Sequence, residues 1–266
     1  MEVHHPHHPT HKKKWSEYII EFVMLFAAVT LGFFAENVRE HQVEKHKTEK
    51  SLISLYNETQ NDSITFAITI PKRNKTDTLF RIISKYHNNG TFKNHLREAY
   101  IFIHYASFRQ FATINNMAID EIKSTGRLNF VDDNNLLNSI QKYSLSSKLL
   151  EIREKREENY LTQFIDPMRI QFFNYNTLRS ITNGKNIIIE NGSFTTEPAN
   201  SLFEKIELVN KNKFDEEIFF NTMNGMTVAI LGSNSSIVIP AQNQCIDLLK
   251  CLRNYFYKNN VDFKIK

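Results

Sequence analysis

The chain has 266 residues, of which 41% are hydrophobic and 23% are charged, and its formal net charge is +4. The basic residues are spread through the sequence without a concentrated block, which argues against nucleic acid as a partner. Seven glycines and six prolines are few for this length, so helices are favoured over many short strands.

Residues 1–15 are predicted to form a histidine-rich tail on the cytoplasmic side, in which Pro6 and Pro9 oppose a helix. Five of the ten histidines lie here, and clustered imidazoles can bind a soft divalent metal. Because no cysteine or carboxylate stands at a fixed spacing from them, we expect a flexible tail without a metal site. The sequence as a whole predicts no cofactor.

Residues 16–35 are predicted to be a transmembrane helix. The run YIIEFVMLFAAVTLGFFA, residues 18–35, carries one charge, Glu21. As a helix it covers about 27 Å, close to the thickness of a hydrocarbon core. Lysines 12–14 and Trp15 precede it as a basic and aromatic collar typical of interfacial anchoring.

Two alternatives compete with a membrane span. A cleaved signal peptide needs small residues before the cut, whereas Phe33 and Phe34 make a poor site. A buried helix of a soluble protein is compatible with the charge-free core, because residues 22–35 number only 14. The collar favours an uncleaved single-pass signal-anchor.

Three lysines precede the span and four basic residues, Arg39, Lys45, Lys47 and Lys50, follow it, so the Lys and Arg count decides little. The tail before the span is short and the part after it is long. We therefore expect the N-terminus in the cytoplasm and residues 36–266 on the other side of the membrane.

The span also carries a candidate packing face. A 3-4-3-4 spacing runs along one side of the helix, and Gly32 makes a small-xxx-small pair with Ala28 on a neighbouring face. This face is predicted to contact a partner helix or a second copy. Glu21 at its start is either a functional group or a carboxyl close enough to the headgroups to reach water. The residues of the packing face are Glu21, Met24, Ala28, Leu31, Gly32 and Ala35.

After the span the helix is predicted to continue as a solvated stalk, residues 36–70, which Pro71 ends. Residues 71–266 are predicted to form a soluble helical domain, so the fold class is all-α. Asn191-Gly192 suits a type I′ turn and predicts a small β-hairpin at residues 186–197. Apolar spacing predicts helices at residues 76–87, 92–105, 108–124, 214–231 and 241–259, and a long one that starts at residue 132 or 133.

A structural corner is predicted between two of these helices. Gly126 can adopt the positive φ that ends the first helix, and Asp132 or Asp133 can cap the next one. Leu128 and Phe130 are expected to alternate into the core between them. Near the C-terminus, Cys245 and Cys251 are too far apart to bridge each other, and we expect two small buried side chains.

The sequence offers few candidate catalytic residues. His95 and His104 are nine residues apart and point in opposite directions on one helix, while Glu98 and Asp120 are the nearest acids. No catalytic loop or metal-binding motif of a known type is present. The sequence therefore predicts a non-catalytic interaction, scaffold or sensor module. A membrane-tethered enzyme and an accessory subunit of a transport complex, dependent on Glu21, are the alternatives.

Two segments carry a resemblance to a known family. HKKKWSEYIIEFVMLFAAVTLGFFAENVRE near the N-terminus, and FRQFATINNMAIDEIKSTGRLNFVDDNNLLNSIQKY later, resemble a bacterial family of uncharacterised single-pass membrane proteins, a domain of unknown function. The second segment looks like that family's central motif, with Gly126 ending one helix and Tyr143 ending the next. The resemblance implies a Gram-negative envelope protein with one span and a helical domain, and it implies no catalytic residue. Together with the expected orientation, it implies a bacterial inner-membrane protein with its C-terminal domain in the periplasm.

Overall fold

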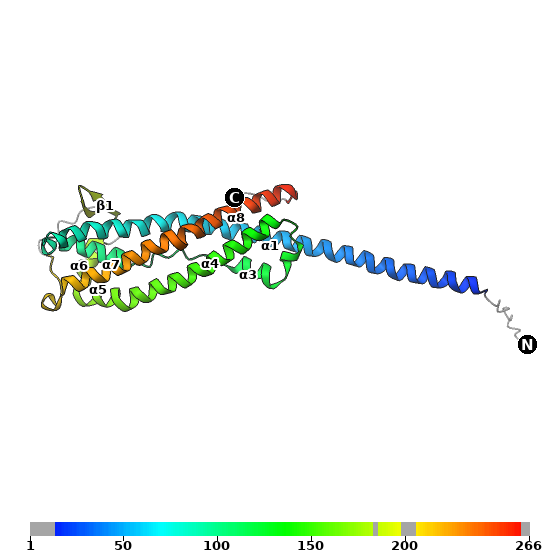
Figure 1. Ribbon diagram of the computed structural model, residues 1–266, viewed down its shortest axis with the longest axis horizontal. Coiled ribbons are helices and arrows are strands. Elements are labelled where there is room, and N and C mark those ends of the chain that lie inside the picture. The colour runs from blue at the N-terminus through cyan, green and yellow to red at the C-terminus, as the bar shows by residue number, and fades with distance from the viewer. Residues whose placement is uncertain (1–13, 183–185, 198–205, 262–266) are drawn as a thin grey trace, which may run out of the picture.

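The computed structural model describes residues 14–182, 186–197 and 206–261. These residues are almost all helical, with one two-stranded antiparallel sheet, so the predicted all-α fold with a small hairpin is confirmed. A long helix leaves the bundle as a bare rod toward the N-terminus (Figure 1). The predicted histidine-rich tail, up to residue 13, lies outside the described residues.

The long helix is α1, Trp15–Asn88, with 74 residues and a length of about 111 Å. Its N-terminal part holds the one described segment that is long and apolar enough to cross a membrane. None of that segment is buried inside the protein. Buried side chains begin only at Thr48 and recur to Ile83, which marks where α1 enters the bundle.

Pro71 does not end α1, so that prediction was wrong. The proline lies inside the helix with an exposed side chain. An interior proline costs about 3 kcal/mol, and tertiary packing on both sides offsets this cost, because Thr69 and Arg73 are buried against other elements. The predicted boundary between a stalk at residues 36–70 and a domain at residues 71–266 therefore shifts: His41 already packs against Phe130, with ring centroids 5.5 Å apart, and fully buried side chains start at Thr48.

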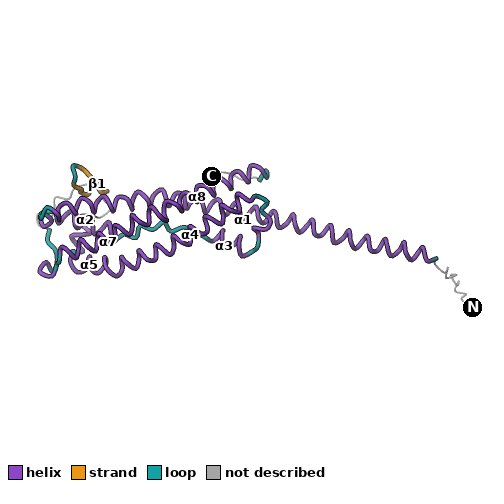
Figure 2. Tube along the Cα trace, in the orientation of Figure 1, coloured by secondary structure: helices purple, strands orange, loops and turns teal. Residues whose placement is uncertain are grey.

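The rest of the bundle consists of shorter helices that lie beside α1 (Figure 2). Two of them pass into single π-helical turns, Leu161–Ile165 and Asn234–Val238, before the next helix begins. The helices are α2 Leu96–Ser107, α3 Met117–Ser124, α4 Asn134–Tyr160, α5 Asp166–Phe172, α6 Tyr175–Thr182, α7 Glu216–Ser233 and α8 Ile239–Lys258.

Two hydrophobic clusters follow one another along α1. The cluster nearer to the rod contains Leu52 and Phe66 of α1, packed with residues of α3, α4 and α8. The cluster farther from the rod contains Leu79 and Ile83 of α1, packed with residues of α2, α5 and α7. The buried Arg73 lies on α1 between these two stretches.

The predicted helix at residues 108–124 forms only in its second half. Residues 108–116 form neither helix nor strand and connect α2 to α3, which begins at Met117. We call residues 108–116 the strap. Helical spacing of its apolar residues was a misleading signal, because neighbouring helices supply hydrogen-bond acceptors for its backbone, as described below.

The predicted corner is partly confirmed. Gly126 has a φ of 69°, the left-handed conformation that favours glycine. Asp133, and not Asp132, caps α4 by accepting hydrogen bonds from the backbone N–H groups of Asn135 and Leu136. Leu128 and Phe130 lie in a 3₁₀ turn, Arg127–Phe130, in which both are half-buried on either side of the exposed Asn129, and Leu128 packs against the cluster nearer to the rod.

The predicted hairpin is confirmed. Strands β1, Asn186–Glu190, and β2, Ser193–Glu197, pair antiparallel, with Glu190 opposite Ser193. Asn191 and Gly192 have φ values of 50° and 74°, and positive φ at both central residues defines the type I′ turn.

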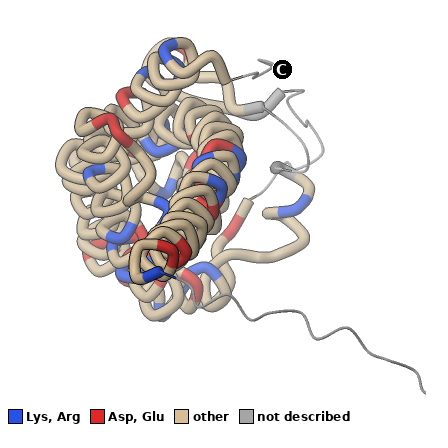
Figure 3. Tube along the Cα trace, turned by 90° about the vertical axis from the view of Figure 1, so that its right-hand side faces the viewer, with Lys and Arg blue, Asp and Glu red and all other residues tan. Residues whose placement is uncertain are grey.

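The charged residues of the described chain have no separate basic face. Viewed along the bundle, Lys and Arg positions alternate with Asp and Glu positions around its circumference (Figure 3). A mixed surface of this kind suits a solvated domain better than a nucleic-acid-binding one.

Candidate functional site

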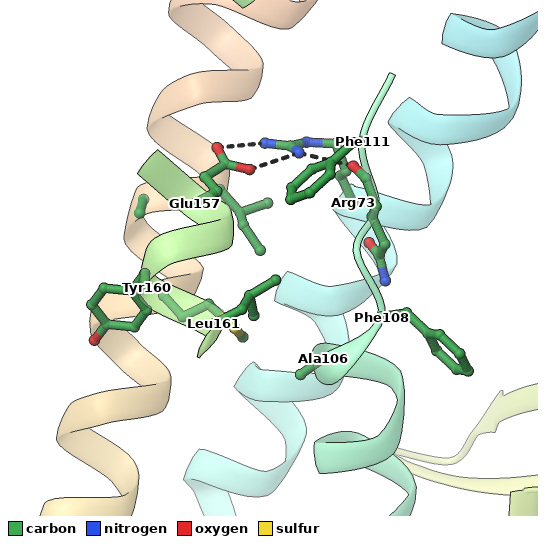
Figure 4. A pocket seen from close by; sticks show the side chains of 11 residues that line it. Arg73, Ala106, Phe108, Phe111, Glu157, Tyr160 and Leu161 are labelled. Carbon is green, nitrogen blue, oxygen red and sulfur yellow. Dashed lines mark hydrogen bonds and ion pairs between the residues drawn. The ribbon is translucent and has the colours of Figure 1, made fainter. Parts of the chain in front are cut away.

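The strongest polar feature of the bundle is a buried ion pair between Arg73 of α1 and Glu157 of α4. Arg73 is 1% exposed and Glu157 is 7% exposed. The two side chains face each other in a bidentate arrangement, with both N–O distances 2.9 Å (Figure 4). Bidentate arginine–carboxylate pairs are among the stronger and more directional hydrogen-bonded contacts in proteins.

Every N–H group of Arg73 has an acceptor. Besides the two bonds to Glu157, its Nη1 donates to the backbone oxygen of Gln110 at 3.0 Å, its Nε to Asn234 Oδ1, and its Nη2 to Ser233 Oγ. A guanidinium has five such groups, so none is left for a ligand. The arginine joins α1, α4, the end of α7 and the strap.

Both helices that meet Arg73 widen close to it. The π turn at Leu161–Ile165 begins one turn after Glu157, and the other π turn begins at Asn234 itself. Single π turns in α-helices are frequent at functional sites. Here the two π turns lie next to the buried Arg73–Glu157 pair, where the chain passes from one hydrophobic cluster to the other.

A small cavity adjoins the ion pair. Its volume is about 20 Å³, and its mostly apolar lining includes Ala106, Phe111, Leu161 and Ile230 (Figure 4). This is room for about one water molecule, whereas ligand pockets are typically about 300–1,000 Å³. The site can therefore hold the helices together, but it has no space for a substrate.

The strap is held by carboxylates. Three backbone N–H groups at three-residue spacing, from Ala112 and Asn115 of the strap and Ala118 of α3, donate to acidic side chains of the long helices. Their acceptors are Glu154 at 2.6 Å, Asp62 at 3.1 Å and Glu58 at 2.9 Å, in that order. A non-helical segment beside helices has no strand partner, so side chains must satisfy its backbone.

Burial raises the pKa of each of these three carboxyls. The effect is largest at Glu154, where burial raises the pKa to about 7, while the Ala112 N–H group and the Arg73 guanidinium act in the opposite direction. Glu157 adds a further increase through charge repulsion. Glu154 therefore titrates near neutral pH, in contact with the strap.

Asp62 also joins a second buried network. It accepts a hydrogen bond from the Tyr143 hydroxyl at 2.7 Å, and the nearby Cys245 thiol donates to the Thr59 carbonyl at 3.2 Å. Burial raises the pKa of Cys245 to about 12, so this thiol is not a nucleophile at neutral pH. The prediction of buried cysteines is confirmed for Cys245, whereas Cys251 is half-buried.

The residues considered for an enzyme do not meet in one site. His95 pairs with Glu98 at 3.3 Å and stacks on Tyr86, with ring centroids 3.6 Å apart. His104 packs against Phe108 instead, and burial followed by the charge of Arg169 lowers its pKa.

The fourth of these residues, Asp120, is exposed on α3. Among residues 14–182, 186–197 and 206–261, no cluster of three His, Cys, Asp or Glu side chains suits a metal.

The membrane-segment residues and the buried site lie far apart on α1. Met24 and Leu31 are 60% and 67% exposed, and Glu21, Ala28, Gly32 and Ala35 are exposed as well. The buried site at Arg73 was missed by the sequence reasoning. Its signal was present, since Arg73 lies seven residues after the buried Phe66 and thus on the apolar side of α1.

Comparison with known proteins adds no further identification: no family model, curated protein or solved structure matches this chain.

Replacing Arg73 by alanine should lower the free energy of unfolding by about 3 kcal/mol, because it leaves the buried Glu157 with only the longer contact to the half-buried Arg153, at 3.3 Å. The double variant Arg73→Met with Glu157→Leu should recover part of this loss, since no buried carboxylate remains and the half-buried Arg153 keeps its hydrogen bond to the Ala229 carbonyl. Urea denaturation followed by circular dichroism measures both values.

The control for this pair of variants is Lys250→Ala, which removes an exposed ion pair with Asp247 at 3.4 Å. It should change the free energy of unfolding by less than about 1 kcal/mol. Equal losses in the single and double variants at Arg73 would show that the buried charge is not the cause.

The stability of the protein should fall as the pH rises from 5 to 8, through Glu154. Burial raises the pKa of this carboxyl to about 7 in the folded protein, so the folded state binds its proton more tightly than the unfolded chain. The resulting stabilisation is complete below the usual glutamate pKa and is lost as the pH rises through 7. Because the side chain is partly exposed, we expect a loss of about 1 kcal/mol.

Urea denaturation at several pH values tests this contribution. Glu154→Gln, which is neutral throughout, should show a flatter dependence than the wild type, and Glu151→Gln on the exposed side of α4 should not. Parallel curves for the wild type and Glu154→Gln would refute the assignment.

Proposed function

We propose that this chain is a non-catalytic, single-pass membrane protein of a Gram-negative envelope, whose helical bundle acts as an interaction, scaffold or sensor module. One observation carries the proposal: α1 runs without a break from the apolar segment to the buried Arg73. The bilayer and a protein partner, or a second copy of the chain, are the partners this function needs.

The exposure of the apolar segment supports a membrane environment. A core helix of a soluble protein would be covered by the rest of its own chain, whereas this segment is 0% buried. Phe22, Leu25, Phe33 and Phe34 are between 67% and 73% exposed. Such a continuous apolar surface favours a lipid or protein partner over water.

Continuity of α1 also supports a role in transmitting or positioning. From Gly32 to Arg73 the helix spans about 60 Å without an intervening loop. Arg73 is bonded to three other parts of the bundle, so a shift of those parts would move α1 as a unit.

The fully hydrogen-bonded side chain of Arg73 supports a non-catalytic role. A reacting group needs a free donor or acceptor and space for a substrate. Arg73 has all of its donors occupied, and the adjoining cavity holds about one water molecule. The tethered-enzyme and transport-subunit alternatives have no comparable observation in their favour.

The wild-type protein should remain in the membrane pellet after a carbonate wash of cells that express the full chain. Ala28→Arg combined with Leu31→Arg should shift it toward the soluble fraction, because each arginine costs about 2.5–3.5 kcal/mol at the centre of a span. Gln42→Arg with Val43→Arg, on the exposed part of α1, is the matched control and should stay in the pellet.

The same cells also test the orientation of the protein in the membrane. Protease added to spheroplasts should digest the domain after residue 35, since we place it in the periplasm. A wild-type protein that carbonate releases would end the membrane proposal, and a protected domain would reverse the orientation alone.

The packing face of the span predicts self-association. Gly32→Leu should weaken a dimer in mild detergent, because the added side chain separates the helix backbones at the small-xxx-small pair. Glu21→Gln tests whether the carboxyl contributes, and Phe33→Leu on the opposite face is the control. Analytical ultracentrifugation measures the change, and no shift in either variant would leave the span with an anchoring role only.

A further inference from the structure

The end of the bundle away from the rod contains a hollow of about 630 Å³. Its walls come from the 3₁₀ turn Phe92–Asn94, the start of α2, and residues 206–216, which lead into α7. We propose that this hollow binds a small organic anion with an apolar or aromatic body. The inference goes beyond the proposed function and does not depend on the membrane segment.

The inner surface of the hollow is apolar. Phe92 is 1% exposed and packs against Phe214, with ring centroids 6.1 Å apart. Leu96, Ile206 and Leu208 complete this surface. A hollow of this volume with an aromatic floor is of the size and character that small-molecule sites have, about 300–1,000 Å³.

The outer wall is fixed to the bundle by hydrogen bonds. The Tyr100 hydroxyl donates to the backbone oxygen of Glu207 at 2.8 Å, and the Val209 N–H group donates to the backbone oxygen of Phe172 at 2.8 Å. Asn210 Nδ2 donates to the Gln171 oxygen at 3.1 Å. Because these contacts hold the wall in place, a ligand would enter a preformed site and would not have to order the loop.

Two lysines and two glutamates line the rim, and one of the lysines has no ionic partner within the described parts of the chain. Lys211 is paired with Glu207 at 3.7 Å, and Glu216 is paired with His87 at 2.8 Å. Lys93 also lines the hollow, and it has no ion pair within the described parts of the chain. With His87 neutral, the formal charge of these four side chains is zero, so the preference for an anion rests on Lys93. Its unpaired ammonium group lines the hollow together with the apolar floor, where it can pair with the carboxylate of a molecule that has an apolar body.

The test uses the full chain in lipid nanodiscs and 4-(trifluoromethyl)benzoate as the probe, observed by ¹⁹F NMR. Empty nanodiscs give the contribution of lipid partitioning. We expect saturable line broadening with the wild type and about tenfold weaker binding with Lys93→Gln, since a charge-assisted hydrogen bond is worth about 1.5 kcal/mol or more. Lys93→Arg should retain most of the affinity.

Three controls make the outcome decisive. Lys85→Gln, an exposed lysine of α1 that does not line the hollow, should bind as the wild type does. Leu208→Trp, which fills the hollow, should abolish saturable binding, and the neutral 4-(trifluoromethyl)benzamide should not distinguish Lys93→Gln from the wild type. Absence of saturable binding to the wild type, or equal losses in Lys93→Gln and Lys85→Gln, would overturn the inference while leaving the membrane experiments unaffected.

Discussion

The bundle depends on how the backbone of the strap is hydrogen-bonded. Residues 108–116 lie beside helices and belong to no helix or strand, so their N–H groups need acceptors from side chains. Asp62 of α1 and Glu154 of α4 provide them from opposite sides. Their carboxylates are kept partly buried at a cost in desolvation, which is the physical reason that their pKa values are raised. The strap thus fixes α1 relative to α4 through its own backbone.

Arg73 satisfies a backbone acceptor of the strap, as the carboxylates satisfy its backbone donors. The carbonyl of Gln110 in the strap needs a donor, and the guanidinium supplies one while pairing with Glu157. A buried ion pair is weak evidence of stability in itself, because desolvation of both charges opposes their attraction. What it provides is geometry: with all five donors used, Arg73 is satisfied in one arrangement of α1, α4 and the end of α7. The charge therefore defines the register between the two hydrophobic clusters.

Local signals in the sequence were sufficient for much of this fold. The apolar run, the Asn191-Gly192 turn and the glycine at position 126 each depend on neighbouring residues alone. The structure has a helix over the apolar run that is long and apolar enough to span a membrane, and it agrees with the predicted turn and the positive φ of Gly126. Pro71 and the strap were mispredicted because tertiary contacts decided them: packing carries the helix through the proline, and acceptors from distant helices stabilise a non-helical strap. The pairing of Arg73 with Glu157 joins residues 84 positions apart, which periodicity could not predict beyond the presence of a charge on an apolar face.

Two of the three notable sites lie on α1 and the third begins just after its end, and this arrangement constrains any mechanism. The apolar segment occupies the N-terminal part of α1, Arg73 its bundle portion, and the hollow at Phe92 follows four residues after its last residue, Asn88. A ligand that shifted the 3₁₀ turn at Phe92 would act on the end of α1, which is held laterally by Arg73 and has no loop before the apolar segment. Displacement along the helix axis is opposed by the bonds of Arg73 to three elements, so a change at the hollow would have to move these elements together with α1. A sensor built in this way would respond through rigid movement of the bundle and not through bending of the rod.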